Sequence, residues 1–133
     1  MTDASTRGRS NRLKGQRGER ELANELSDLL GITLKRRVRN HANESDITGL
    51  PGFSVEVKNC AVLSVAAWWK QTVAQCDLTK ECPALFYKIP RKGFRAVLPM
   101  VCLVDGNVTD DLTFTVEMSV PAFAMFYREH HCG

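Results

Sequence analysis

The segment FSVEVK, residues 53–58, alternates apolar and polar residues and therefore predicts a β-strand. Side chains on a strand point alternately to two faces. Val55 and Val57 are expected to face the core, whereas Glu56 and Lys58 are expected to point together from the opposite face. A strand of this kind needs a sheet to pair with and a helix to cover the valines.

The rest of the chain supplies both kinds of partner. A helix is predicted over residues 15–30, because Leu22, Ala23, Leu26, Leu29 and Leu30 form one apolar stripe that ends at Gly31. The other predicted elements are a strand over 32–39, a strand entered at 46–47, a turn at 50–52, a helix from Ser64 to Cys76 with Ala66, Ala67, Trp69, Val73 and Ala74 on its apolar side, strands over 84–89, 94–98, 101–104 and 114–118, and a terminal helix that starts at Ser119 and Pro121. This order predicts an α/β fold with a mixed central sheet flanked by helices.

The length of 133 residues suits one domain with a single core. Hydrophobic residues make up 44% and charged residues 25% of the chain, which is typical of a folded globular protein. We expect a basic, flexible arm over residues 1–13 and a single domain over residues 14–133. No separate domain for a small-molecule cofactor is expected.

No segment predicts contact with a membrane. The uncharged stretch over residues 96–104 contains Pro99 and is far shorter than the roughly 20 apolar residues that cross a bilayer. The start of the chain is basic and polar, with no apolar segment behind it, unlike a secretory signal. We therefore expect a cytoplasmic protein.

The five cysteines are odd in number and form no CxxC pair, so they predict reduced thiols and neither a disulfide framework nor a zinc ribbon. Two interpretations exist for residues 130–132, His-His-Cys: a soft-metal site or a solvated tail. Adjacent residues at a chain end lack the spacing of a structural zinc site, which favours the tail.

The basic residues are concentrated near the start. Residues 1–39 carry ten Lys or Arg against five Asp or Glu, and residues 40–133 carry eight against ten. Such an asymmetry suits a phosphate backbone. A solvated tail followed by a polar strand is the alternative explanation.

The acidic residues suggest a second function for the strand at 53–58. Phosphodiester hydrolysis needs a metal ion that polarises the phosphate and activates water, together with a cation near the developing charge. Magnesium prefers carboxylate oxygens. Asp46, Glu56 and Lys58 offer such a set if the turn brings the strand at 46–47 beside the strand at 53–58. An Asp/Glu-x-Lys tripeptide alone is common, and a surface ion pair between Glu56 and Lys58 would also explain it.

Two further residues are candidates for the same site. Glu19 lies on the apolar stripe of the first predicted helix, where a buried carboxylate needs a metal or a cation to offset its desolvation. Alternatively, it only interacts with the helix dipole. Gln71 lies on the helix after the Glu-x-Lys strand and is either a site residue or a surface glutamine.

Taken together, these residues resemble a known family. KGQRGEREL at residues 14–22, the basic strand that ends at Arg39, Ser45-Asp46 and Glu56-Val57-Lys58 are similar to the PD-(D/E)XK nucleases, in their archaeal and phage Holliday-junction resolvase branch. The resemblance covers about residues 14–75. It implies a restriction-endonuclease-like core.

The resemblance also implies roles for individual residues. Asp46, Glu56 and Glu19 would bind Mg²⁺, with Mn²⁺ able to substitute, and Lys58 would position or activate the attacking water. The residues expected to contact DNA are Lys14, Arg17, Arg20, Arg37, Arg39 and Ser45. The family works as a homodimer that nicks opposed strands of a four-way junction, and a phage-encoded member would act in the host cytoplasm.

The resemblance leaves the substrate open. The LPGF turn at 50–53 and the Trp68-Trp69 pair differ from the archaeal pattern, and related nucleases cut flaps, nicks or duplex DNA. A non-catalytic DNA-binding module of the same fold is a further alternative. Of the two tryptophans, one is expected in the core, and the other at the dimer interface or stacked on a base. Phe123, Phe126 and Tyr127 are expected to pack in the core.

Overall fold

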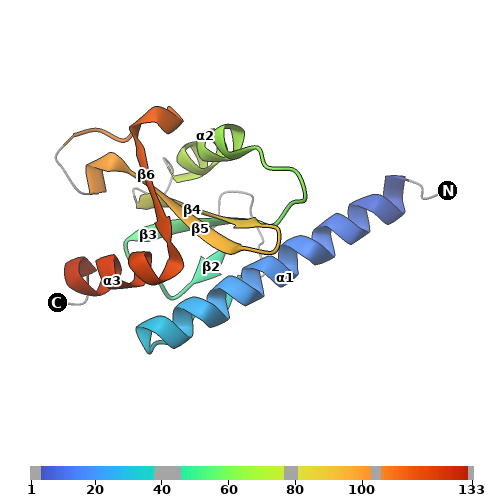
Figure 1. The fold of residues 1–133 in the computed structure, drawn as a ribbon, viewed down its shortest axis with the longest axis horizontal. Coiled ribbons are helices and arrows are strands. Elements are labelled where there is room, and N and C mark those ends of the chain that lie inside the picture. The colour runs from blue at the N-terminus through green and yellow to red at the C-terminus, as the bar shows by residue number, and fades with distance from the viewer. Residues whose placement is uncertain (1–3, 38–45, 77–80, 103–105, 132–133) are drawn as a thin grey trace.

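The structure is a computed structural model that describes residues 4–37, 46–76, 81–102 and 106–131. Its elements follow the order α1 (Ala4–Leu30), β1 (Lys35–Arg36), β2 (Ile47–Thr48), β3 (Phe53–Lys58), α2 (Val65–Cys76), β4 (Cys82–Ile89), β5 (Gly93–Pro99), two short 3₁₀ helices (Met100–Cys102 and Leu112–Phe114), β6 (Thr115–Ser119) and α3 (Val120–His131). Figure 1 shows these elements as a central sheet with helices on both sides.

The main sheet has four strands in the order β3-β4-β5-β6. Strands β3 and β4 are parallel, whereas β4-β5 and β5-β6 are antiparallel, so the sheet is mixed. Strands β1 and β2 form a separate antiparallel pair. The predicted α/β class, with a mixed sheet between helices, is confirmed and agrees with a restriction-endonuclease-like core.

Alternation along β4 divides the core into two layers. Ala84 and Phe86 face the side covered by α1 and α3, where Leu26 and Phe123 also pack. Leu85 and Tyr87 face α2 and pack against Trp69. Figure 1 shows the same arrangement, with α2 on one side of the sheet and α1 and α3 on the other.

Two glycines with positive φ lie where the sequence predicts the end of a helix and a turn. Gly31 follows the last residue of α1 with a φ of 68°, and its amide donates to the carbonyl of Ser27. This left-handed residue is a common end of a helix. Gly52 has a φ of 87° in the turn where the amide of Phe53 donates to the carbonyl of Leu50. The turn leads directly into β3.

Helix α1 is longer than predicted. It begins at Ala4, and not at residue 15, and Figure 1 shows its first half extending beyond the rest of the molecule. Residues before Lys14 lack an apolar stripe, which is why the prediction began later. Once the packed half of a helix is formed, each added residue contributes a hydrogen bond without a new nucleation step. The division into an arm over 1–13 and a domain over 14–133 stays a prediction.

Three other predictions of secondary structure need correction. The strand expected over 32–39 is reduced to Lys35–Arg36, and its end at 38–39 lies outside the described residues. The strand expected over 101–104 is a 3₁₀ helix at Met100–Cys102 in its described part. A short apolar run does not by itself distinguish a strand from a turn of helix.

The third correction concerns the face of α2. Ala66, Ala67 and Ala74 are exposed, and the buried residues are Trp69, Thr72, Val73 and Cys76. The hydroxyl of Thr72 donates to the carbonyl of Trp68 at 2.7 Å, which satisfies its polar group inside the core. The alanines favour the helix through propensity and not through burial.

The aromatic predictions are confirmed in part. Trp69 is in the core and Trp68 is half-buried against Tyr87, 6.2 Å away between ring centroids. Phe123 and Tyr127 are buried, and Phe126 packs against them.

No helix in the described ranges combines the length and hydropathy needed to span a bilayer.

Candidate active site

Asp46 lies against the outer edge of β3. Its amide donates to the carbonyl of Val55 at 2.7 Å, and its Oδ2 accepts a hydrogen bond of 2.7 Å from the amide of Val57. Its own carbonyl accepts from the amide of Arg37 at 2.9 Å. Only 1% of Asp46 is exposed. These contacts hold its carboxylate in one place beside the strand.

Glu56 and Lys58 lie next to Asp46 on β3. Val55 and Val57 point into the core beneath α1 and α3, so strand alternation turns Glu56 and Lys58 to the other face, as predicted. Glu56 is only 4% exposed, and its Oε1 lies 3.4 Å from the Nζ of Lys58. A buried carboxylate of this kind is costly unless a cation is near.

Helix α1 brings a third carboxylate to the same place. Glu19 is half-buried, and its Oε2 lies 3.6 Å from a guanidinium nitrogen of Arg36 at β1. The cationic partner that the helix position requires is therefore present in the chain itself.

The approach of α1 to β3 depends on Gly18. A β-carbon at Gly18 would lie 2.7 Å from the Cβ of Asn59, which is closer than real Cβ atoms come to other atoms. The side-chain amide of Asn59 donates to the carbonyl of Lys14 at 3.0 Å. Gly18 and Asn59 together fasten the helix to the end of β3.

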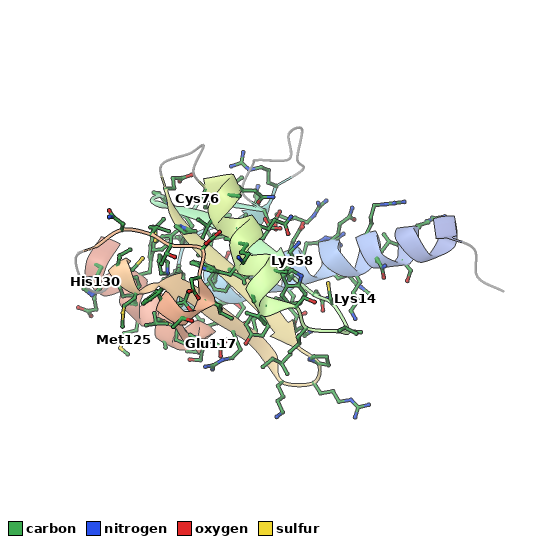
Figure 2. The ribbon with its side chains drawn as sticks, turned by 90° about the horizontal axis from the view of Figure 1, so that it is seen from above. Lys14, Lys58, Cys76, Glu117, Met125 and His130 are labelled. Carbon is green, nitrogen blue, oxygen red and sulfur yellow. The ribbon has the colours of Figure 1, made fainter. Side chains whose placement is uncertain are left out.

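Helix α1, strand β3 and the segment around Asp46 surround a pocket of about 580 Å³. Its lining includes Glu19, Asp46, Glu56 and Lys58, and Arg37 directly after β1. Figure 2 shows Lys58 on the side of the molecule from which α1 extends, whereas Met125 and His130 lie with α3 on the other side. Acidic groups, an amine and a guanidinium thus share one pocket.

The sequence matches the model of a family described as "Phage putative PDDEXK endonuclease" over residues 10–127. The chain belongs to this family. The match includes α1 from residue 10, the whole sheet and most of α3. No curated protein matches the sequence. As a PDDEXK endonuclease the chain is assigned to the nucleases, and the resemblance to the PD-(D/E)XK fold is confirmed.

The endonuclease does not bring every predicted residue into this pocket. Gln71 is exposed on α2 and is absent from the lining. Lys14 and Arg17 lie on α1 outside the lining, and Arg20 borders a neighbouring hollow with Lys35 and Arg36. The roles of these residues stay predictions. Arg39 and Ser45 lie outside the described residues.

Other lining residues were not assigned to the site from the sequence. On α1 they are Asn11, Arg12, Gly15 and Gln16. Residues 12, 15 and 19 are three or four positions apart and so share a face of one helix. This spacing would have identified them if the predicted helix had begun before residue 15.

At the end of β3, Asn59 and Cys60 also line the pocket. Arg36 at β1 joins them, although only Arg37 and Arg39 were predicted from the basic cluster. For these three residues only proximity to Lys58 or Arg37 in the sequence was available as a signal.

The carboxylate and carbonyl oxygens at the pocket are the kind of ligand that a hard divalent cation prefers. Among the described residues, no three Asp, Glu, His or Cys side chains lie close enough to hold one ion. Asp46 and Glu56 provide two carboxylates, and the Val57 carbonyl points to the same side of β3 as the amide that binds Asp46. Two carboxylates with waters and a carbonyl are sufficient for magnesium, which keeps part of its hydration shell.

Proposed function

We propose that this PDDEXK endonuclease is a magnesium-dependent DNA nuclease that resolves four-way junctions by paired nicks. The observation that carries the proposal is the meeting of two buried carboxylates, Asp46 and Glu56, with the amine of Lys58 in one pocket. Burying two carboxylates side by side is costly unless a cation lies near, and a bound metal ion would supply such a cation. The family assignment and the basic α1 support a polyanionic substrate.

The chain's own groups divide the chemistry among them. Asp46, Glu56 and the carbonyl of Val57 would hold Mg²⁺ or Mn²⁺. The bound ion supplies Lewis acidity for the phosphate and lowers the pKa of a water. Lys58, 3.4 Å from Glu56, orients that water and offsets the negative charge that develops on the phosphate.

Arginines near the carboxylates would bind the DNA strand. Arg12, Arg36 and Arg37 line the pocket and carry permanent charge. Glu19 completes the acidic set and keeps Arg36 beside the pocket through their ion pair. Fixing the phosphate in this way lowers the entropy cost of the reaction.

Paired nicks require two identical sites, which a two-fold homodimer provides. The support for a junction substrate is the resemblance of residues 14–75 to the resolvase branch. The first half of α1 extends from the molecule and carries the exposed Arg9 and Arg12. Its positive charge is available to DNA beyond the one duplex that the pocket would contact. The competing substrates are flaps, nicks and plain duplex.

The central experiment removes each carboxylate without changing its size. Asp46→Asn and Glu56→Gln are expected to abolish cleavage and leave DNA binding equal to or tighter than wild type, because each removes a negative charge near the phosphate. Asp28→Asn and Glu129→Gln, at exposed positions of α1 and α3, are the matched controls and should cut normally. Cleavage by both site variants would show that the pocket is not the active site.

The substrate is tested with labelled four-way junction, flap, nicked and duplex DNA in Mg²⁺, Mn²⁺ or EDTA. Symmetric nicks in the junction, absent in EDTA, are the expected result. Equal cutting of all four substrates would overturn the proposed preference for junctions but would support the proposed nuclease activity. Binding to DNA without cleavage of any substrate would instead favour a non-catalytic binding module.

A further inference from the structure

Gly15 occupies a position in α1 that the packing of the described residues does not explain. It lies near the middle of a helix of 27 residues, where glycine is the least favourable residue apart from proline. Apart from the backbone of its own helix, a β-carbon built on Gly15 would meet no atom of the described residues within 4 Å. Gly18, only one turn later, differs because its β-carbon would collide with Asn59. An alanine would thus fit at Gly15 and strengthen the helix.

The open space beside Gly15 belongs to the pocket of the carboxylates. Gly15 lines that pocket, with Arg12 one turn before it and Glu19 one turn after it. At 1.5 Å per residue, the helix face from Arg12 to Glu19 extends for about 10 Å. This face leads from the acidic groups towards the extended half of the helix.

We propose that Gly15 is a clearance position, at which the sugar-phosphate backbone of the DNA strand crosses α1 on its way into the active site. The inference rests on the proposed nuclease function and adds where the strand runs. Without a β-carbon, the helix surface allows a deoxyribose or phosphate to lie against Cα, where its contacts are van der Waals and weak C–H···O interactions. Arg12 and Gln16, which flank Gly15 in the lining, then reach phosphates on either side.

The proposal predicts opposite changes in stability and in binding for one substitution. Gly15→Ala should raise Tm by roughly 2–5 °C, because it removes an unfavourable helix residue. The same methyl group should weaken DNA binding about tenfold, and Gly15→Leu should weaken it about a hundredfold, as expected for overpacking of a close contact. A purely structural role for Gly15 would not produce this graded loss of binding in a more stable protein.

Gly8 provides the matched control. It lies two turns earlier in α1 and outside the lining. Among the described side chains, its β-carbon would meet Arg12 Nη1 alone, at an ordinary 3.6 Å. Gly8→Ala should raise Tm or leave it unchanged and should bind DNA like wild type, because its methyl group makes only ordinary contact with Arg12. The comparison separates clearance for the strand from a general effect of helix propensity.

The measurement is fluorescence anisotropy with a labelled four-way junction in EDTA, followed by cleavage in Mg²⁺. Wild-type affinity of a folded Gly15→Leu would overturn the proposal, as would equal losses at Gly8 and Gly15. If Gly15→Leu does not fold, Gly15→Ala decides alone, by its affinity at raised Tm. Failure of the wild type itself to bind or cut any DNA would instead refute the proposed function, so the two failures are distinguishable.

Discussion

The contact between Gly18 and Asn59 allows the position of the site to be tested through packing. In Gly18→Ala the new β-carbon would start 2.7 Å from the Cβ of Asn59, whereas ordinary contact begins at 3.4 Å, so the two segments must separate by about 0.7 Å. Overpacking of this kind costs roughly 1–3 kcal/mol. The better helix propensity of alanine offsets about 1 kcal/mol of this loss in the free energy of unfolding. Loss of the hydrogen bond from Asn59 to Lys14 removes about 1 kcal/mol.

The net expectation for Gly18→Ala is a loss of about 1–3 kcal/mol in the free energy of unfolding, or a fall in Tm of roughly 3–10 °C. Glu19 follows Gly18 directly and would move with it. Because catalytic groups lose roughly a hundredfold in rate for a displacement near 1 Å, cleavage should fall by about tenfold to a hundredfold. Urea unfolding and a cleavage assay with the four-way junction measure the two effects.

Asn59→Gly, which removes the opposing β-carbon, is the rescue. In a double-mutant cycle, Gly18→Ala should cost less in the Asn59→Gly background than in wild type, because the clash is gone. Gly8→Ala controls for helix propensity alone. Equal stability of Gly18→Ala and wild type, or additivity of the two substitutions, would contradict the close approach of α1 to β3.

Two further predictions concern the charge and the entrance of the pocket. DNA affinity should fall by on the order of tenfold or more between about 50 and about 200 mM salt, and Arg12→Gln and Arg36→Gln should each lower the slope by about one unit; a salt-independent affinity would exclude this arginine-lined face from binding. Cys60 is exposed at the pocket, whereas Cys76 is buried, so a bulky maleimide should attach to Cys60 and block cleavage. Bound DNA should protect the wild type, Cys60→Ser should resist the reagent, and inhibition of Cys60→Ser to the same extent would refute the placement of this thiol.

The parts of the fold that could be predicted are those set by neighbouring residues. Strand β3 was predicted with its observed bounds, because its alternation and the Pro51-Gly52 turn are local signals. The end of α1 at Gly31 and the start of α3 at Ser119 were also local. In the latter, the hydroxyl of Ser119 accepts from the amide of Ala122 at 3.2 Å, as an N-cap does.

The parts that could not be predicted depend on contacts between distant segments. Asn59 meets Gly18 and the carbonyl of Lys14, 45 residues away, and no pattern in either segment names the other. Likewise, Arg36 was not distinguished from Arg37, the next residue in the chain, since the backbone conformation at β1 decides which of the two faces Glu19. Gly15 belongs to the KGQRGEREL motif, but the sequence does not show that the space beside it opens into the pocket.

The position of Asp46 explains why the site could still be recognised from so few residues. Strand β3 is at the edge of the main sheet, where unpaired backbone groups invite unwanted pairing. Asp46 occupies two of these groups, the carbonyl of Val55 through its amide and the amide of Val57 through its carboxylate. The residue that closes the edge therefore also fixes a carboxylate beside Glu56, so the fold and the proposed chemistry call for the same side chain. Asparagine keeps an acceptor for the amide of Val57 and removes only the charge, whereas alanine would leave that buried amide unsatisfied at a cost of about 1–3 kcal/mol. For this reason Asp46→Asn separates the chemical role of the residue from its structural one.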